Sequence, residues 1–572
     1  MQEKRYIKNT VILFISMAIT KIVGALFKIP LANLLGGTGM GYFSTAYGLY
    51  SPIFALTAAG IPTVMMRITA RYAAAGDRKY AFAVRKVALV LFTAIGVAGS
   101  AAIIVFARFF AVNIACSPQS TLAVMCISPA VMLCCTASVL RGYREGLSNV
   151  MPSAAASVAE AVSRAVFGLG LSYSVIIYAK NAFQNGKSVF GNDVSTLEQA
   201  FNAALPYAAA GAILAVSISE LCGLLAMIVI DRRYRKSEAL PPRCDYCRRD
   251  ICLQLMKETA PIAASALVMN CVSFVDLLTV TRALSASVAK NPEYYSSAFG
   301  NIFASCGGLE GLPNFMYGSY TGIAMSLFML IPSFAGMTEK TAAPEIAAAW
   351  ERKDGELICD KITMQLRAGA LIACPACFGA AALAKPIMSM LYRSRTAEVS
   401  VALNSFIILC MGGIFMVTAS AMFGIFQSIN KAHIPLFLMM GSVAVKLLLN
   451  PLFISIPQLN ISGAPLAGTI GYIIMTVCGG KLLNDVLPKK INILSAVYKP
   501  LVCGIICGFS AYITYSLLEN RINPTLNVLF SVSVGAIVYL ISLILVGIFR
   551  KNGKITPKIQ KNFKNPLQNL EK

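Results

Sequence analysis

Charge is scarce in this sequence, and long polar stretches are scarcer still. Charged residues make up 13% of the 572 residues, which is about half the share of a soluble protein, whereas apolar residues make up 57%. A soluble chain of this length divides into several domains joined by polar linkers, and no such linkers separate the apolar runs here. Together with a mean hydropathy of +0.69, the composition excludes an ordinary soluble protein.

The motifs of common enzymes are also missing. His433 is the only histidine, which excludes a Ser–His–Asp triad and a histidine-based metal site. No Walker A motif occurs, so the chain carries no ATPase of its own. The glycine-rich GGTGMG at 36–41 follows no strand and lacks GK[ST], and it predicts a short turn between two membrane spans. We expect no catalytic site, no cofactor and no nucleic-acid partner.

Cysteine is plentiful, but its placement does not suggest disulfides. Most of the 17 cysteines lie inside apolar runs, where cysteine behaves as a small hydrophobic residue. Cys244, Cys247 and Cys252 form a short cluster in a basic loop. A structural zinc site needs four ligands, and neither a second pair nor a histidine lies near. Metal binding by this cluster is left open.

Apolar runs of about 20 residues recur from end to end, and each is long enough to cross a bilayer as a helix. They predict an all-α integral membrane protein with about fourteen transmembrane helices. The predicted spans are 10–35, 43–70, 82–107, 119–141, 152–179, 203–230, 252–281, 313–338, 361–384, 400–427, 434–455, 463–486, 496–518 and 526–549.

Basic residues alternate between loops. With the N-terminus placed inside, Lys and Arg gather in the inner loops, as the positive-inside rule requires. This pattern accounts for the net charge of +24 without any nucleic acid. The basic N-terminus precedes an apolar stretch that is too long for a signal peptide and lacks a small-residue cleavage site. We predict a retained first helix and cytoplasmic N- and C-termini.

The chain is predicted to contain a repeat. Pro62 and Pro344 lie at corresponding places if the first six spans repeat as the next six, and so do Pro152 and Pro435. Repeated halves are common in transporters. The predicted divisions are an N-terminal lobe at 1–231, a basic cytoplasmic linker at 232–250, a C-terminal lobe at 251–490, two further helices at 491–550 and a basic cytoplasmic tail at 551–572.

Several cations lie within the predicted spans, where ionisable side chains usually face a protein interior or a watery cavity. Lys21 and Lys28 lie about two helical turns apart on one face of the first span. Arg67 lies toward the inner end of the second span, and neither span contains an acid. With Lys446 of the eleventh span, these residues predict a basic cavity that attracts phosphate. Snorkelling to the interface is the alternative, and it suits Arg67 best.

Two further pairs are candidates for ion coupling or gating. Glu160 and Arg164 have the i, i+4 spacing of an intrahelical ion pair, which is equally consistent with a purely structural role. Asp276 of the seventh span precedes Arg282 by six residues. This pair either bridges the two halves, or Asp276 takes up a proton or Na⁺.

Three stretches resemble a known family: Thr20–Asp77, Arg141–Arg164 and Tyr317–Leu330. They are similar to the stage V sporulation protein B and polysaccharide-biosynthesis flippases of Gram-positive bacteria. That family belongs to the superfamily of MATE-like multidrug/oligosaccharidyl-lipid/polysaccharide exporters, which includes the lipid II flippases. The resemblance covers nearly the whole chain.

The resemblance implies two six-helix lobes around a central cavity, two extra C-terminal helices, alternating access and a bacterial cytoplasmic membrane. It implies an undecaprenyl-pyrophosphate-linked sugar as substrate and cell-wall synthases as candidate partners. In lipid II flippases an arginine shortly before a glycine in the first span is expected to meet the pyrophosphate. Lys21, before Gly24, matches that position but lacks the bidentate fork of arginine. Lys28 has no clean counterpart and remains a prediction from the residues alone.

Two other functions are less consistent with the sequence. A MATE-like multidrug exporter of organic cations needs acids and aromatics in its cavity, whereas the first span carries lysines. A membrane transferase or polymerase needs grouped catalytic acids, and the outer-loop acids are scattered: Asp193, Glu198, Glu293 and Glu310. The identity of the sugar, the source of energy and the vegetative or sporulation role are left open.

Overall fold

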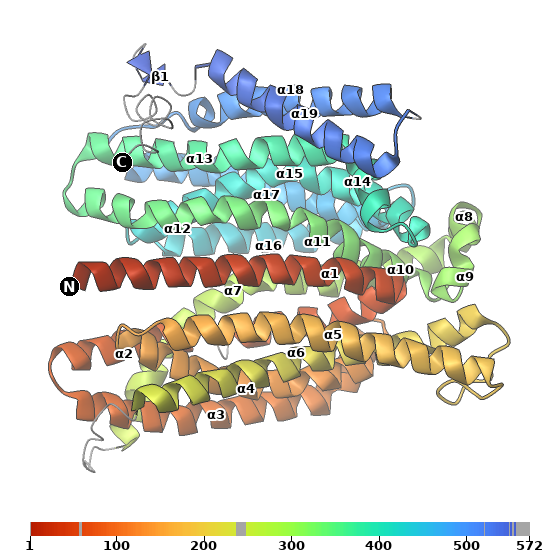
Figure 1. Ribbon diagram of the computed structural model, residues 1–572, viewed down its shortest axis with the longest axis horizontal. Helices are drawn as coiled ribbons and strands as arrows, with labels where there is room; N and C mark the ends of the chain where they lie inside the picture. Colours follow the sequence, from red (N-terminus) through yellow and green to blue (C-terminus); the bar gives the residue numbers. More distant parts are fainter. Residues whose placement is uncertain are drawn as a thin grey trace, which may run out of the picture. The chain divides into compact units, whose positions relative to one another are not determined.

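The computed structural model describes residues 2–55, 60–235, 248–519, 521–547, 550–551 and 554–555. Most of the described residues are helical, and the two strands among them form a two-residue antiparallel ladder between β1 (Arg550–Lys551) and β2 (Lys554–Ile555). Val189 and Asn192 form an isolated bridge in the loop between two helices. The predicted all-α fold is confirmed (Figure 1).

The long helices in chain order are α1 (Gln2–Phe54), α2 (Ile61–Ala74), α3 (Arg78–Phe109), α4 (Thr121–Gly146), α5 (Met151–Gln184), α6 (Leu197–Arg235), α7 (Arg248–Lys290), α12 (Leu330–Glu351), α13 (Gly355–Ala382), α15 (Thr396–Ser428), α16 (His433–Ile454), α17 (Gly463–Val486), α18 (Ile493–Leu518) and α19 (Pro524–Leu545). Short segments complete them: η2 (Phe110–Ile114), η3 (Pro118–Ser120), α8 (Pro292–Phe299), η4 (Gly300–Ile302), α9 (Phe303–Cys306), α10 (Leu312–Ser319), η5 (Tyr320–Ala324), α11 (Met325–Phe328), α14 (Ala384–Leu391) and η6 (Asn460–Ser462).

Twelve helical stretches of the described chain are long and apolar enough to cross a membrane. They show a multi-pass membrane protein, but the predicted count of about fourteen is not confirmed. The two predicted spans outside this set are 43–70 and 252–281. The first is divided between α1 and α2, with residues 56–59 outside the described part, and the second lies within the longer helix α7.

The direction of α1 breaks at Gly36. This residue has φ 64° and ψ −173°, whereas the residues on both sides are helical. Glycine adopts a positive φ without the steric cost that a Cβ atom would impose. The turn predicted for residues 36–41 is therefore confined to its first glycine, and α1 consists of two helices joined at Gly36.

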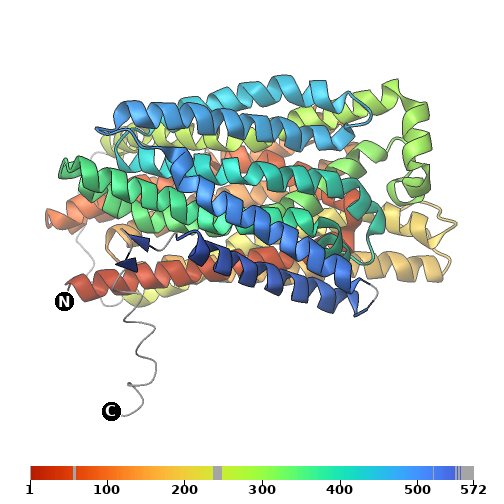
Figure 2. The same ribbon diagram turned by 90° about the horizontal axis from the view of Figure 1, so that it is seen from above.

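Helices α5 and α6 form an antiparallel pair and lie side by side (Figures 1 and 2). Their register is set by small residues. Gly211 lies against Leu171, and the hydroxyl of Ser172 donates a hydrogen bond to the carbonyl of Ala208 at 3.0 Å. One end of the interface carries Gly223, which lies against Glu160. Small residues let membrane helices approach closely, and this approach positions the ionisable side chains described below.

Contacts divide the chain into two compact units. Unit 1 comprises residues 1–327, 392–405 and 436–471, and unit 2 comprises 328–391, 406–435 and 472–572. Helix α7 falls in the same unit as α1 to α6. The predicted division into lobes at 232–250 is not tested by this contact-based division, and it stays a prediction.

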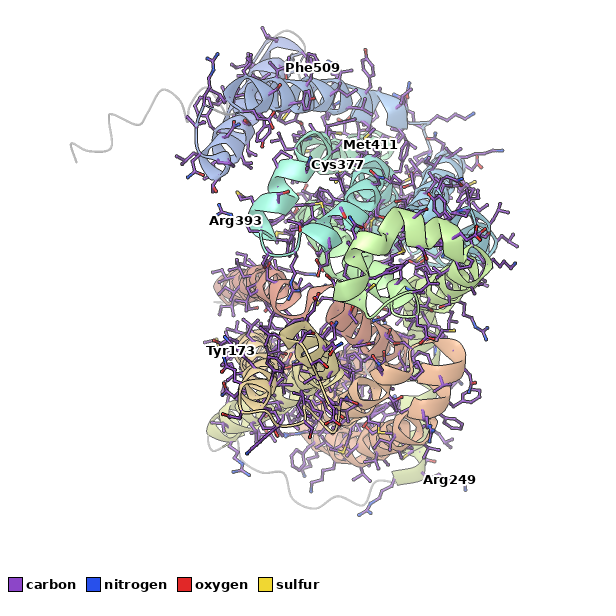
Figure 3. All side chains as sticks on the ribbon, turned by 90° about the vertical axis from the view of Figure 1, so that its right-hand side faces the viewer. Tyr173, Arg249, Cys377, Arg393, Met411 and Phe509 are labelled. Carbon is purple, nitrogen blue, oxygen red and sulfur yellow. The ribbon has the colours of Figure 1, made fainter. Side chains whose placement is uncertain are left out.

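Unit 2 is built around α13, α15 and α18. A buried apolar cluster includes Ile362, Met422 and Leu483. Gly504 and Gly508 of α18 lie directly against the backbone of α13, so these two helices also pack through small residues. The opposite face of α18 carries Phe509, labelled in Figure 3, which is 66% exposed. An exposed apolar face is what a helix in contact with lipid presents.

The cysteines that the structure describes carry free thiols. In the predicted cluster, Cys252 lies half-buried on α7, whereas Cys244 and Cys247 lie outside the described residues.

Candidate functional site

The predicted cations of the first span lie on α1 beside α5. Phe27 of α1 packs into the space left by Gly168 of α5, where a Cβ atom would lie 2.7 Å from the Phe27 ring. Lys21 is exposed and Lys28 is half-buried. Within the described chain, the charged groups that act on Lys28 are Lys21 and Arg164, and both are cations. Two cations of α1 and one of α5 therefore act on one another in this region.

Arg164 is held by α6. Its Nη2 donates to Oε1 of Glu220 at 3.3 Å, and its Nε donates to the hydroxyl of Ser219 at 3.3 Å. The predicted i, i+4 partner, Glu160, acts on Arg164 electrostatically but forms its own ion pair with Arg141 of α4. The intrahelical pair is thus replaced by two ion pairs that connect neighbouring helices.

Glu160 and Glu220 approach each other across the α5–α6 interface. The carboxylate of Glu160 lies over Gly223, one helical turn beyond Glu220. The two acids repel each other, and Arg141 and Arg164 attract both of them. We call these four residues, together with Lys21 and Lys28 of α1, the α1/α5/α6 cluster, to which α4 adds Arg141: Lys21, Lys28, Arg141, Glu160, Arg164 and Glu220. Its formal charge is positive, because four cations face two acids.

An aromatic stripe faces this cluster from the second part of α1. Phe43, Tyr47, Tyr50 and Phe54 contact one another in sequence, with ring centroids 5.5–6.0 Å apart. Tyr47 and Tyr50 interact electrostatically with Arg164. The spacing along one helical face was visible in the sequence, but its position beside Arg164 depends on the break at Gly36.

A second charged cluster joins α7 to α16. Lys446 Nζ lies 2.6 Å from Oδ2 of Asp276, and the amide of Asn450 donates to Oδ1 of Asp276 at 3.1 Å and to the hydroxyl of Thr279 at 2.8 Å. We call these residues the α7/α16 cluster. Lys446 is 3% exposed and Asp276 is 8% exposed. No acid close to Lys446 in the sequence indicates this pair, because its partner lies 170 residues earlier in the chain.

The remaining predicted residues lie apart from both clusters. Arg282 is exposed and donates to the carbonyl of Asn113 at 3.0 Å, so it contacts η2 rather than Asp276. Arg67 is exposed on α2, which fits a side chain that extends to an interface.

An ion pair that the sequence did not reveal occupies the break in α1. Arg395 donates to the carbonyls of Asn33 and Leu34 at 3.0 and 3.1 Å, and Glu398 accepts from the backbone N–H of Gly37 at 3.1 Å. The two side chains lie 3.6 Å apart. A cation therefore meets the carbonyl end of one helix and an anion meets the amide end of the next, and both placements favour the helix dipoles.

A second missed group joins the ends of three helices. Asp231 of α6 binds Arg85 of α3 at 2.8 Å and also pairs with Arg144 of α4. All three side chains are at least 95% buried. Arg85 and Arg144 both lie against the ring of Tyr143, which adds cation–π attraction. No spacing rule connects residues of three different helices, so the sequence could not predict this group.

Comparisons with known proteins show which proteins this chain is similar to. Residues 6–191 match the model of the polysaccharide biosynthesis protein family. The stage V sporulation protein B of Bacillus subtilis is 22% identical and aligns over 96% of this chain and 97% of its own length. The lipid II flippase MurJ of the same organism is 20% identical over 94% of each chain.

Solved structures show the same fold. Lipid II flippase MurJ in an inward closed conformation superposes with a TM-score of 0.67 at 14% identity, over 93% of this chain and 98% of that one. An inward-facing multidrug resistance MATE family transporter superposes with a TM-score of 0.59 at 14% identity, over 82% and 96%.

The protein is a multi-pass membrane protein with the fold of the MurJ and MATE transporters. In sequence it is similar to the polysaccharide biosynthesis protein family over residues 6–191, and to stage V sporulation protein B and MurJ of Bacillus subtilis over nearly its whole length.

Proposed function

We propose that the protein is a flippase that moves an undecaprenyl-pyrophosphate-linked sugar, either lipid II or a polysaccharide repeat unit, across the bacterial cytoplasmic membrane by alternating access. It would serve cell-wall, spore-cortex or surface-polysaccharide synthesis, with both termini in the cytoplasm and with cell-wall synthases as its partners. The observation that carries the proposal is the excess of cations in the α1/α5/α6 cluster, on helices long enough to span a membrane.

The physical argument concerns the anionic head group. A pyrophosphate loses its hydration when it enters a membrane, and a low-dielectric site compensates for this loss only if cations face it. Lys28 has cations as its electrostatic neighbours and Lys21 is exposed. An anion between them relieves their mutual repulsion. The names of the relatives, one of which is a lipid II flippase, point to the same class of substrate.

A MATE-like multidrug exporter is the second candidate, because the fold is shared with a MATE transporter. Such a protein needs acids that are available to an organic cation. The acids of both clusters are paired with cations of the protein: Glu160 with Arg141, Glu220 with Arg164 and Asp276 with Lys446. This pairing favours the flippase.

The test is translocation of fluorescent lipid II in proteoliposomes, with wild type compared with Lys21→Ala. Because Lys21 is exposed, its loss should leave folding intact while transport falls about tenfold or more. Lys353→Ala, which removes a lysine from the turn before α13, is the matched control. Equal transport by wild type and Lys21→Ala would remove Lys21 from the site but keep the flippase. A folded wild-type protein that moves no lipid II or other polyprenyl-linked sugar would contradict the proposal.

A further inference from the structure

Arg164 has N–H donors that its contacts with described residues do not use. A guanidinium carries five N–H groups, and the contacts of the described residues use two of them, on Ser219 and Glu220. Both bonds are 3.3 Å long, at the weak end of the range for charged groups. The side chain remains 29% exposed, whereas Glu220 is 7% exposed. Arg164 can therefore bind a further acceptor from its open side.

The surroundings of Arg164 differ on its two sides. Toward α6 lies Glu220, with Glu160 one turn further on. Toward α1 lie Lys28 and then Lys21, where the electrostatic partners are all positive. An anion that binds beside Lys21 and Lys28 can also contact Arg164 as a third cation. It then competes with Glu220 for the same guanidinium.

Tyr50 supplies an independent sign of a ligand. Its side chain is 5% exposed, and its hydroxyl makes no hydrogen bond to any described residue. Glu220 and Arg164 are among the charged groups in the surroundings of this side chain. A buried hydroxyl without a partner is costly, and a phosphoryl oxygen on Arg164 would give it an acceptor.

From these contacts we propose that Glu220 is an internal competitor for the anion that this site binds. Phosphoryl oxygens of the head group replace Glu220 on Arg164, and Tyr50 donates to the same anion. This inference rests on the proposed function for the identity of the anion as a pyrophosphate, and it adds Arg164 and Tyr50 to the lysines as ligands.

The exchange has a clear physical advantage. A buried cation without a partner is strongly destabilising, so an Arg164 that served the substrate alone would destabilise the empty protein. With Glu220 in place, Arg164 is paired both before and after the substrate binds. The competition also keeps affinity moderate, which a carrier requires because it must release what it binds.

A purely structural Arg164–Glu220 pair makes the opposite prediction. If the pair only holds α5 to α6, removing the carboxylate should loosen the fold and leave anion binding unchanged or weaker. If Glu220 competes with the anion, the same change should tighten anion binding. The sign of the effect therefore separates the two roles.

The experiment measures binding of inorganic pyrophosphate to the full chain in lipid nanodiscs by titration calorimetry. Glu220→Gln should tighten binding about tenfold or more, because it removes a rival acceptor and a negative charge. Arg164→Gln should weaken binding by a similar factor, and Tyr50→Phe should weaken it about threefold. Glu345→Gln, which removes the acid of an exposed pair with Lys361 in unit 2, is the matched control and should change nothing.

A double variant tests the mechanism itself. In the Arg164→Gln background, Glu220→Gln should no longer give its full gain, because there is no guanidinium left to compete for. A gain that persists in full would show a general effect of charge and would overturn the competition. Glu220→Asp, with a shorter reach, should give an intermediate gain and serves if Glu220→Gln does not fold.

Failure of this inference and failure of the proposed function give different results. If wild type binds pyrophosphate and Lys21→Ala weakens it, while folded Glu220 and Arg164 variants bind as wild type does, this inference is wrong and the function stands. If wild type binds no pyrophosphate and moves no polyprenyl-linked sugar, both are wrong.

Discussion

The α1/α5/α6 cluster and the α7/α16 cluster both place charges within membrane helices, but they balance those charges differently. In the α7/α16 cluster one lysine faces one aspartate, both are almost fully buried, and Asn450 completes the coordination of the acid. In the α1/α5/α6 cluster the cations outnumber the acids, and Lys21, Lys28 and Arg164 retain exposed surface. A neutral, closed cluster leaves no buried charge without a partner, whereas a positive, open one attracts an anion.

The largest effect is expected where the charges are most buried. Lys446→Met alone should leave Asp276 buried and unpaired, and it should destabilise the protein by about 3–5 kcal/mol. Unfolding in mixed micelles measures this loss. The double variant Lys446→Met, Asp276→Asn should recover most of it, because no charge is then left alone. A single variant as stable as wild type would show that the α7/α16 cluster is not the closed structural pair described above.

Substitution of Lys28 in α1 should lower transport without lowering stability, in contrast to substitution of Lys446. Lys28→Gln should lower lipid II translocation by about tenfold while the melting temperature stays the same or rises, since the charged groups that act on it in the described part of the chain, Lys21 and Arg164, are cations. Translocation in proteoliposomes and thermal unfolding of the same samples give the two readouts. A fall in both would mean that Lys28 is structural, and it would remove the contrast between the clusters.

In the wild-type protein, salt should affect anion binding at the open cluster more than the stability that depends on the buried cluster. Pyrophosphate binding at the open α1/α5/α6 cluster should weaken severalfold between about 0.05 and 0.5 M salt, because the Debye length that screens exposed charges falls from about 14 Å to about 4 Å over this range. Stability that depends on the buried Lys446–Asp276 pair should change little. Calorimetry and unfolding over the same salt series provide the comparison. Equal sensitivity of both would contradict the difference in exposure.

The smallest effect is expected outside the open cluster, at Arg67. Arg67 is exposed on α2, and Arg67→Gln should lower transport less than Lys28→Gln does. The translocation assay ranks the two. A stronger effect from Arg67 would extend the anion site to α2 and support the cavity role predicted for it.

The sequence predicted the membrane helices and the common face of Lys21 and Lys28, because both depend on local patterns of three to twenty residues. It did not predict which acid binds which base. Glu160 and Arg164 have suitable spacing within one helix, yet Glu160 pairs with Arg141 of α4 and Arg164 pairs with Glu220 of α6. Gly223 of α6 leaves room for the carboxylate of Glu160. The pair of Lys446 with Asp276 and the insertion of Arg395 into the break of α1 likewise depend on contacts between distant segments.

The register of α5 and α6 has a consequence for motion. With small residues along their interface and ion pairs that connect α5 to its neighbours, these two helices are suited to move as one rigid body. Helix α1 carries the only positive-φ break among the long described helices at Gly36, and it brings Lys21 and Lys28. In the proposed alternating access, the backbones of α5 and α6 would keep their register, so that Arg164 can exchange Glu220 for the anion, while the distance from Arg164 to Lys28 changes. The affinity for an anion would thus depend on the angle of α1 against the α5–α6 pair.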